Sequence, residues 1–161
     1  MQEMDELKRE NAILKEKIKD YEKLIDELSA PVIPSIIPNT ILVPLMGKLT
    51  TQRFSRIQNI ILLNIQNQNA DTVLIDFTGI SVDEVDAIGI SQLSHGLFQI
   101  KTSLKLMGVE TIFVGFSPQF SQGLVQAGVD AKKLNTHATF RTGLRYLMNK
   151  KGLEFKSTIN I

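Results

Sequence analysis

Residues 71–77 read DTVLIDF, and from Thr72 to Phe77 this run is apolar on both of its alternating faces. A strand with one buried face alternates apolar and polar residues, whereas a central strand of a parallel sheet is apolar throughout because helices cover both of its faces. The run therefore predicts a buried central strand in an α/β domain, and the rest of the chain is interpreted around it.

Strand and helix patterns alternate on both sides of this strand. Before it, three prolines predict an extended edge segment, a short apolar strand follows, and the next helix has an apolar face at helical spacing. After it, the same alternation continues to Gly152. This order predicts a mostly parallel β-sheet with helices packed on it. The predicted elements around the central strand are an extended segment at 31–38, a strand at 41–46, a helix from 50 onward, a long helix ending at 107, a strand at 111–116, a helix at 117–127, an extended segment at 134–136 and a helix at 139–151.

The first 30 residues carry a heptad repeat. Apolar residues and one asparagine recur at alternating steps of three and four residues, which is the pattern of the a and d positions of a coiled coil. With Met4 at a, Asn11 also falls at a, where it favours two parallel strands because it pairs with its twin only in register. The predicted dimer seam comprises Met4, Leu7, Asn11, Leu14, Ile18, Tyr21, Ile25 and Leu28.

Charged residues beside this seam also favour a parallel homodimer. The g positions of one helix and the e positions of its partner carry opposite charges in three pairs, which select the partner and its orientation more than they stabilise the dimer. The alternative is a single amphipathic helix that lies on the domain. We therefore expect a coiled-coil helix at 1–30, one α/β domain at 31–152 and a flexible tail at 153–161. The three pairs are Glu3 with Lys8, Glu10 with Lys15, and Lys17 with Glu22.

Composition excludes several classes of protein. Of the 161 residues, 43% are hydrophobic and 22% are charged, the net charge is +1, and there is no cysteine. Balanced charge argues against a nucleic-acid-binding protein, which usually has a strongly basic face. No run approaches the roughly 20 apolar residues of a membrane span, so we expect a cytoplasmic protein that neither binds nucleic acid nor enters a membrane.

Four stretches, taken in order, resemble a known family. They are PVIPSIIPNTILVPLMGKLTTQR at 31–53, NADTVLIDFTGI at 69–80, LKLMGVETIFVGFSPQ at 104–119 and VQAGVD at 125–130. Together they resemble the STAS domain of bacterial stressosome proteins of the RsbR type, and more broadly the anti-anti-sigma factors. The resemblance implies a STAS-like fold, and a domain that packs with similar domains into large shells and is phosphorylated on serine or threonine by a switch kinase.

The resemblance also implies sites of phosphorylation. The family's phosphothreonine at a helix start, in a pattern like G-x-x-[DT]-T-x-R, falls on Thr51 of GKLTTQR. Thr78, just after the central strand, is the other candidate hydroxyl. The alternative for Thr50 and Thr51 is that they only cap the helix.

The family's second phosphosite has no hydroxyl in this chain. The stretch after the central strand reads TGISVDEVDAIG, and it is about one to two helical turns longer than the family pattern. Counting forward from the strand aligns the site with Asp83 and Glu84, where Glu84 would be a permanent negative charge at a helix start. Aligning on a D-x-x-G form places it at Asp86 and Ala87, where the site would be inactive.

We expect no cofactor, no metal and no catalysis. The segment GKLTT is not a P-loop, because Leu49 stands where a hydroxyl must follow the lysine. His95 and His137 lie in different elements without acidic neighbours at ligand spacing. The acidic cluster at 83–86 is ordinary for the first turn of a helix.

Gly89 and Gly96 stand seven residues apart in the pattern of the long helix. Glycine is unfavourable inside a helix. We therefore expect both to mark close packing against another backbone, either within the fold or across an interface.

The resemblance implies a non-catalytic stressosome scaffold or sensor subunit. Its expected partners are an RsbS-like STAS scaffold protein and an RsbT-like switch kinase, which it sequesters to regulate an alternative sigma factor. The alternative is a simple anti-sigma factor antagonist switched by one phosphorylation, although neither Asp83 nor Asp86 is followed by a hydroxyl. A small-ligand carrier or an enzyme of similar topology is the third class.

Overall fold

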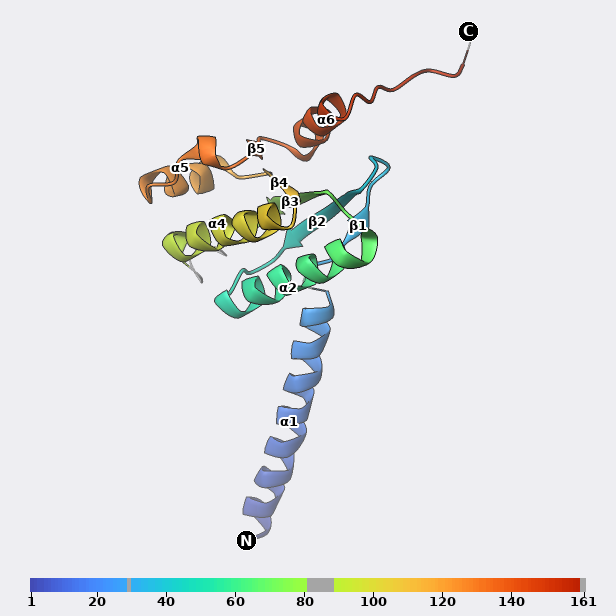
Figure 1. The fold of residues 1–161 in the computed structure, drawn as a ribbon. Helices are drawn as coiled ribbons and strands as arrows, with labels where there is room; N and C mark the ends of the chain where they lie inside the picture. The colour runs from blue at the N-terminus through green and yellow to red at the C-terminus, as the bar shows by residue number, and fades with distance from the viewer. Residues whose placement is uncertain (29, 81–88, 160–161) are drawn as a thin grey trace.

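The structure, a computed structural model, describes residues 1–28, 30–80 and 89–159. A five-stranded sheet has the order β1-β2-β3-β4-β5, with β1 antiparallel to β2 and the other neighbours parallel. This confirms the predicted α/β fold with a mostly parallel sheet, and β3 is the central strand (Figure 1). The elements are α1 (Gln2–Glu27), β1 (Ile33–Pro34), β2 (Thr40–Met46), α2 (Thr51–Gln68), β3 (Thr72–Gly79), α4 (Ile90–Leu106), β4 (Glu110–Val114), α5 (Pro118–Gln126), the 3₁₀ turn η1 (Ala131–Lys133), β5 (Thr136–His137) and α6 (Phe140–Lys150).

Helices cover both faces of the sheet, which is why β3 has buried apolar residues on both of its faces. Val73, Ile75 and Phe77 lie in the larger core with the buried faces of α2, α4 and α5, whereas Leu74 lies in a smaller core with Leu147 of α6. Among the described residues, α2, α4 and α5 thus cover one face of the sheet and α6 covers the other (Figure 1).

The last extended segment was misplaced by the sequence analysis. Strand β5 is Thr136–His137, whereas Leu134 is the C-cap of η1 and only 4% exposed. The side chain of Leu134 belongs to the core. The chain therefore pairs with β4 only beyond this residue, from Thr136 onward.

Helix α1 extends away from the domain and does not lie on it (Figure 1). None of its residues is buried. Its last turn is joined to α2 by an ion pair between Asp26 and Arg56, and Ala30 is buried in the domain core. The alternative of a helix lying on the domain therefore does not describe this chain.

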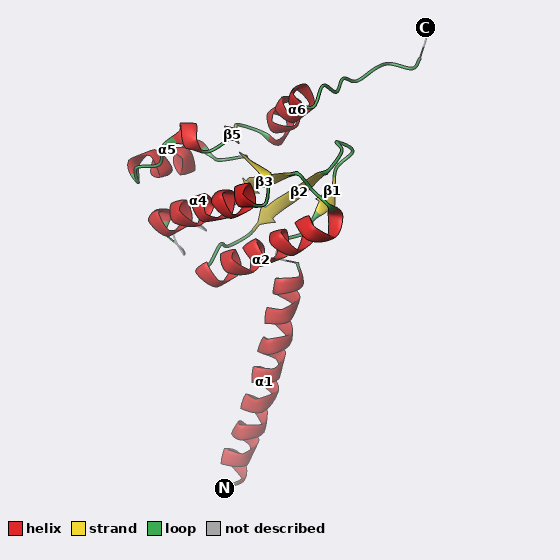
Figure 2. Cartoon of the chain, viewed as in Figure 1, coloured by secondary structure: helices red, strands yellow, loops and turns green. Residues whose placement is uncertain are grey.

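No helix in the described part of the chain is long and apolar enough to cross a membrane. After α6 the described residues 153–159 contain neither helix nor strand (Figure 2).

Candidate functional site

Two adjacent threonines at the start of α2 have different roles. Thr50 is the N-cap, and its side chain accepts a hydrogen bond from the backbone N–H of Arg53 at 3.1 Å. Thr51 is the first residue of the helix and is exposed, and its hydroxyl donates to Oε1 of Gln92 at 3.3 Å. Thr51 is therefore not the cap, and its hydroxyl points toward α4.

The surroundings of Thr51 are electrostatically suited to an anion. The first backbone N–H groups of α2 have no partner within the helix and present the positive end of its dipole. Arg53 lies in the same first turn and donates from Nη1 to the carbonyl oxygen of Lys48 at 2.7 Å, and the first turn of α2 contains no acidic residue. A phosphate on Thr51 would thus lie at the helix N-terminus, in the same turn as Arg53.

Thr78 has a different environment at the carboxyl end of β3. Its hydroxyl donates to Oδ1 of Asp76 at 2.5 Å, and its backbone N–H donates to the same oxygen at 2.9 Å. A Cβ added to Gly115 would lie 2.3 Å from the Thr78 hydroxyl oxygen. Thr78 is therefore exposed, but its hydroxyl is already bound to a carboxylate and lies close to Gly115, which follows β4.

The acidic switch region predicted between β3 and α4 lies outside the described residues. The predicted residues all fall within 81–88, so the structure does not distinguish the two alignments; they are Asp83, Glu84, Asp86 and Ala87.

The seam residues of α1 form an exposed apolar stripe. Their exposed fractions run from 50% at Leu14 to 69% at Leu28, and Asn11 is also exposed. Four heptads with mostly apolar, exposed side chains on one helical face are a large area for a single helix to leave in water.

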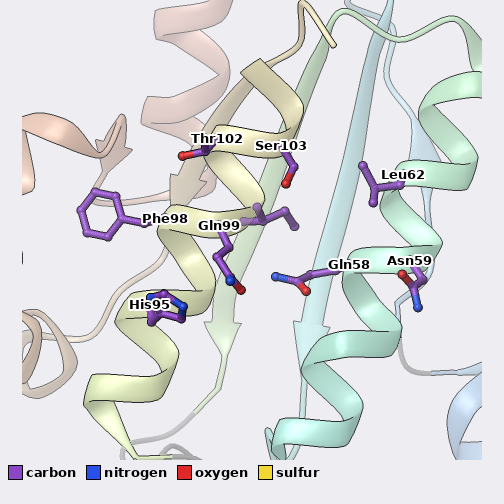
Figure 3. A pocket seen from close by; sticks show the side chains of 9 residues that line it. Gln58, Asn59, Leu62, His95, Phe98, Gln99, Thr102 and Ser103 are labelled. Atoms are coloured by element: carbon purple, nitrogen blue, oxygen red, sulfur yellow. The ribbon is translucent and has the colours of Figure 1, made fainter. Parts of the chain in front are cut away.

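Helices α2 and α4 form a second feature near Thr51. Two adjoining grooves run between them, of about 390 and 480 Å³, and both are lined by Gln58, His95 and Gln99. Figure 3 shows the side chains of Gln58 and Gln99 pointing toward each other from the two helices. Thr51 lines the end of the smaller groove, beside Gln92.

Within the fold, neither of the two glycines packs against another backbone. Gly96 is buried in α4, but a Cβ there would lie 2.3 Å from the ring of Phe54, so it accommodates a side chain and not a backbone. Gly89 is the N-cap of α4, with φ +81° and open space around its Cα, so it serves the backbone conformation at the helix start.

The histidines serve no shared site. His95 is exposed on α4, whereas the His137 ring is half-buried against Tyr146, at 4.6 Å between ring centroids, and bonds Asn135. Within the described ranges, no group of three or more His, Cys, Asp or Glu residues is placed to hold a metal ion.

Sequence reasoning missed two residues of the site, Asp76 and Gln92. An aspartate two residues before a threonine at a strand end is a known local turn pattern, so the contact between Asp76 and Thr78 had a detectable signal. Gln92 had none, because it lies 41 residues from the threonine it contacts.

Comparison with known proteins connects this geometry to a family. Residues 28–143 match the STAS domain model. The chain is 31% identical over 121 residues to the RsbT co-antagonist protein RsbRA of Bacillus subtilis, which covers 75% of this chain and 42% of that protein. It is 30% identical over 122 residues to a blue-light photoreceptor of Listeria innocua, covering 76% of this chain and 46% of that protein. The chain thus spans less than half the length of these curated relatives.

Solved structures agree on the fold. RsbS of Moorella thermoacetica superposes with a TM-score of 0.62 at 20% identity, covering 77% of this chain and 98% of that one. The unphosphorylated anti-sigma factor antagonist SpoIIAA superposes with a TM-score of 0.57 at 14% identity, covering 78% of this chain and 99% of that one. Since the family model covers most of the chain and the fold agrees, this chain belongs to the STAS domain family.

Proposed function

We propose that this chain is a non-catalytic subunit of a stressosome-type assembly. In this role it binds an RsbS-like STAS scaffold protein and, with it, holds an RsbT-like switch serine/threonine kinase away from an alternative sigma factor pathway. Membership of the STAS family and similarity to a protein named RsbT co-antagonist support this role. The cytoplasmic location expected from the sequence stays a prediction.

The observation that carries the proposal is the placement of Thr51. Its hydroxyl is exposed on the first turn of α2, while the neighbouring Thr50 does the capping. A kinase can therefore modify Thr51 without removing the hydrogen bond that starts the helix. The phosphate adds nearly two negative charges beside the positive end of the helix, where an anion is favoured, so we expect the fold to tolerate it.

A phosphate on Thr51 changes what a partner meets. The modified side chain loses its hydroxyl donor to Gln92 and adds negative charge in the same helical turn as Arg53. A partner that bound a neutral threonine would then bind a dianion. The change in partner affinity is large where the site is desolvated and small at a solvated rim.

Thr78 is the weaker of the two candidates. Its hydroxyl is bound to Asp76 at 2.5 Å, so a phosphate there would sit next to a carboxylate. Like charges at this separation repel each other, and Gly115 leaves little room for additional atoms. We therefore expect Thr78 to be phosphorylated much more slowly than Thr51.

We further propose that α1 forms a parallel homodimer through its exposed stripe. The proposed division is a coil at 1–30, a STAS domain at 31–152 and a flexible tail at 153–161. Asn11 at an a position and the charged pairs beside the seam support a parallel register.

The experiment is to incubate the protein with its cognate switch kinase and to map phosphosites over time by mass spectrometry. We expect phosphate mainly on Thr51, little labelling of Thr51→Ala, and near wild-type labelling of Thr78→Ala as the matched control. Phosphate on Thr78 or a serine, with Thr51→Ala labelled as fast as wild type, would exclude Thr51 as the switch.

A measurement of binding to the partner separates the two alignments of the acidic segment. If Glu84 acts as a permanent charge, Glu84→Gln should change affinity for the partner while the fold stays intact. An unchanged affinity would instead favour the alignment on Ala87.

A further inference from the structure

One face of the sheet is covered incompletely. Among the described residues only α6 packs on this face, whereas α2, α4 and α5 cover the other (Figure 1). Along β2, the side chains directed toward the three helices are buried, whereas Leu42 and Pro44, on the α6 side, are only half-buried. Ile33 of β1 pairs with Leu42 and is 47% exposed. The α6 side of β1 and β2 therefore has room for a further element.

A groove of about 370 Å³ lies at this place, between α6 and the short chain that joins β1 to β2. Its α6 side is an apolar ridge, because Phe140, Leu144 and Met148 stand four residues apart on the helix. Ile36 of the joining chain also lines the groove and is 87% exposed, and so does Phe155, which is 80% exposed. Exposed apolar side chains that gather around one groove are typical of an interaction site.

The described lining of the groove contains basic side chains and no acidic one. Arg141 and Arg145 are both exposed, and neither forms a hydrogen bond or an ion pair with the described part of the chain. The two lysines at the other end of the helix differ, since both form ion pairs with acidic residues of the domain. Arg141 also stands in the first turn of α6, where the helix dipole disfavours a cation. The domain gives these arginines no counter-ion, and an occupant of the groove can supply one.

We infer that this groove binds an amphipathic helix of a partner protein, with acidic residues beside the apolar stripe of that helix. The ridge on α6 spans about 12 Å, or two helical turns, and is complementary to apolar side chains three and four residues apart on the occupant. Arg141 and Arg145 are also four residues apart, which matches two carboxylates one turn apart on the flank of the occupant. Arginine binds a carboxylate through two parallel hydrogen bonds.

The bound helix would lie beside α6 as the second helix on this face of the sheet, which is the usual arrangement of layers in an α/β domain. It would cover the open parts of β1 and β2. The inference goes beyond the proposed function and does not depend on it.

Other occupants fit the groove less well. In a two-fold pair with a second copy of this chain, the arginines of both copies would meet at one contact without an acidic residue to neutralise them. The described tail at 153–159 carries one glutamate and one lysine, and its own Phe155 already lines the groove. A small ligand would be poorly enclosed, because binding pockets bury most of a ligand's surface and the side chains here are strongly exposed.

The test selects a phage-displayed library of 16-residue helical peptides, each about 24 Å long, on the full-length protein. We expect enriched peptides that carry an apolar stripe and two acidic residues three or four positions apart. Their binding should weaken at least tenfold in the double variant Arg141→Glu, Arg145→Glu. The matched control is Lys105→Glu with Lys132→Glu, which reverses two exposed cations outside the groove and should bind like the wild type. Lysine in place of the peptide acids should restore binding to the charge-reversed protein.

Ile36→Glu tests the apolar part of the groove. The side chain is exposed, so the variant should keep the circular dichroism spectrum of the wild type while peptide binding falls at least tenfold. Leu106→Glu is the control, because Leu106 is 86% exposed at the end of α4 and does not line the groove.

Several results would overturn the inference. Failure to enrich any peptide over an unrelated bait would do so, as would enriched peptides that bind both groove variants as tightly as the wild type. Binding to phosphatidylglycerol vesicles that both groove variants abolish would assign the groove to a membrane surface. A smaller oligomer in sedimentation of Ile36→Glu would assign it to a second copy. Phosphosite mapping tests the proposed function separately.

Discussion

At the scale of single residues, two neighbouring threonines do different work. Thr50→Ala should lower the free energy of unfolding by about 1 kcal/mol, because it removes the N-cap bond to the N–H of Arg53. Thr51→Ala should change it much less, because the lost bond to Gln92 is exposed and 3.3 Å long. Urea unfolding of both variants measures this difference, and equal losses of stability would contradict the assignment of the cap.

These residues also show where sequence reasoning ends. The pattern GKLTTQR placed a helix start correctly, but either threonine could be the cap, and only backbone geometry identifies Thr50. Ser117 and Pro118 leave no such ambiguity, because proline is favoured at the first helical position, and in the structure Ser117 is the N-cap and Pro118 the first residue of α5. Gln92 and Phe54 were unpredictable as neighbours of Thr51 and Gly96, because such contacts depend on how two distant helices pack.

At the scale of elements, the apolar periods predicted nearly all helices and strands. Only β5 was misplaced, because a two-residue strand carries too little pattern and buried Leu134 looked like part of it. The packing of α2 on α4 requires glycine at 96, where a Cβ would lie 2.3 Å from the ring of buried Phe54.

Gly96→Ala should therefore destabilise the domain by about 1–3 kcal/mol through overpacking, even though alanine favours helix more than glycine does. In the Phe54→Leu background, the same change should cost clearly less. Thermal or urea unfolding of the wild type, the two single variants and the double variant measures the coupling energy between positions 54 and 96. Purely additive losses of stability would show that the Phe54 ring is not the cause.

The proposed coiled coil of α1 gives a second prediction at this scale, at Asn11. Asn11→Ile should raise the melting temperature of the dimer and allow other oligomeric states. The reason is that the asparagine amide, which the proposed dimer buries, specifies register at a cost in stability. Circular dichroism and sedimentation equilibrium measure both effects. A wild-type protein that is monomeric at micromolar concentration would contradict the proposed dimer.

At the scale of the whole molecule, one cluster ties the end of α6 to the sheet. The Nζ of Lys151 donates to Oδ1 of Asp71 at 2.8 Å and to the carbonyl oxygen of Pro38 at 2.6 Å. Burial raises the pKa of Asp71, but hydrogen bonds from Lys151 and Thr72 and the charge of Lys151 outweigh it, so the pKa lies below its usual value of 3.8.

Because this pKa is lowered in the folded state, the carboxylate stabilises the fold above pH 3.8 and the contribution disappears as the pH falls through the lower folded value. Asp71→Asn should cost less than about 1 kcal/mol near pH 7, since the pair is solvated, and less again near pH 2. Urea unfolding at both pH values checks this. An equal cost at both would mean that the charge of Asp71 is not what matters.

The proposed function is tested most directly by the mass of the complex with its STAS partner. Sedimentation velocity is run on the full-length protein alone, on an RsbS-like protein alone, and on their mixture. The proposed role predicts particles with many copies of both chains that also retain the switch kinase when it is added. A mixture that gives only small oligomers and leaves the kinase free would contradict the role of a stressosome subunit.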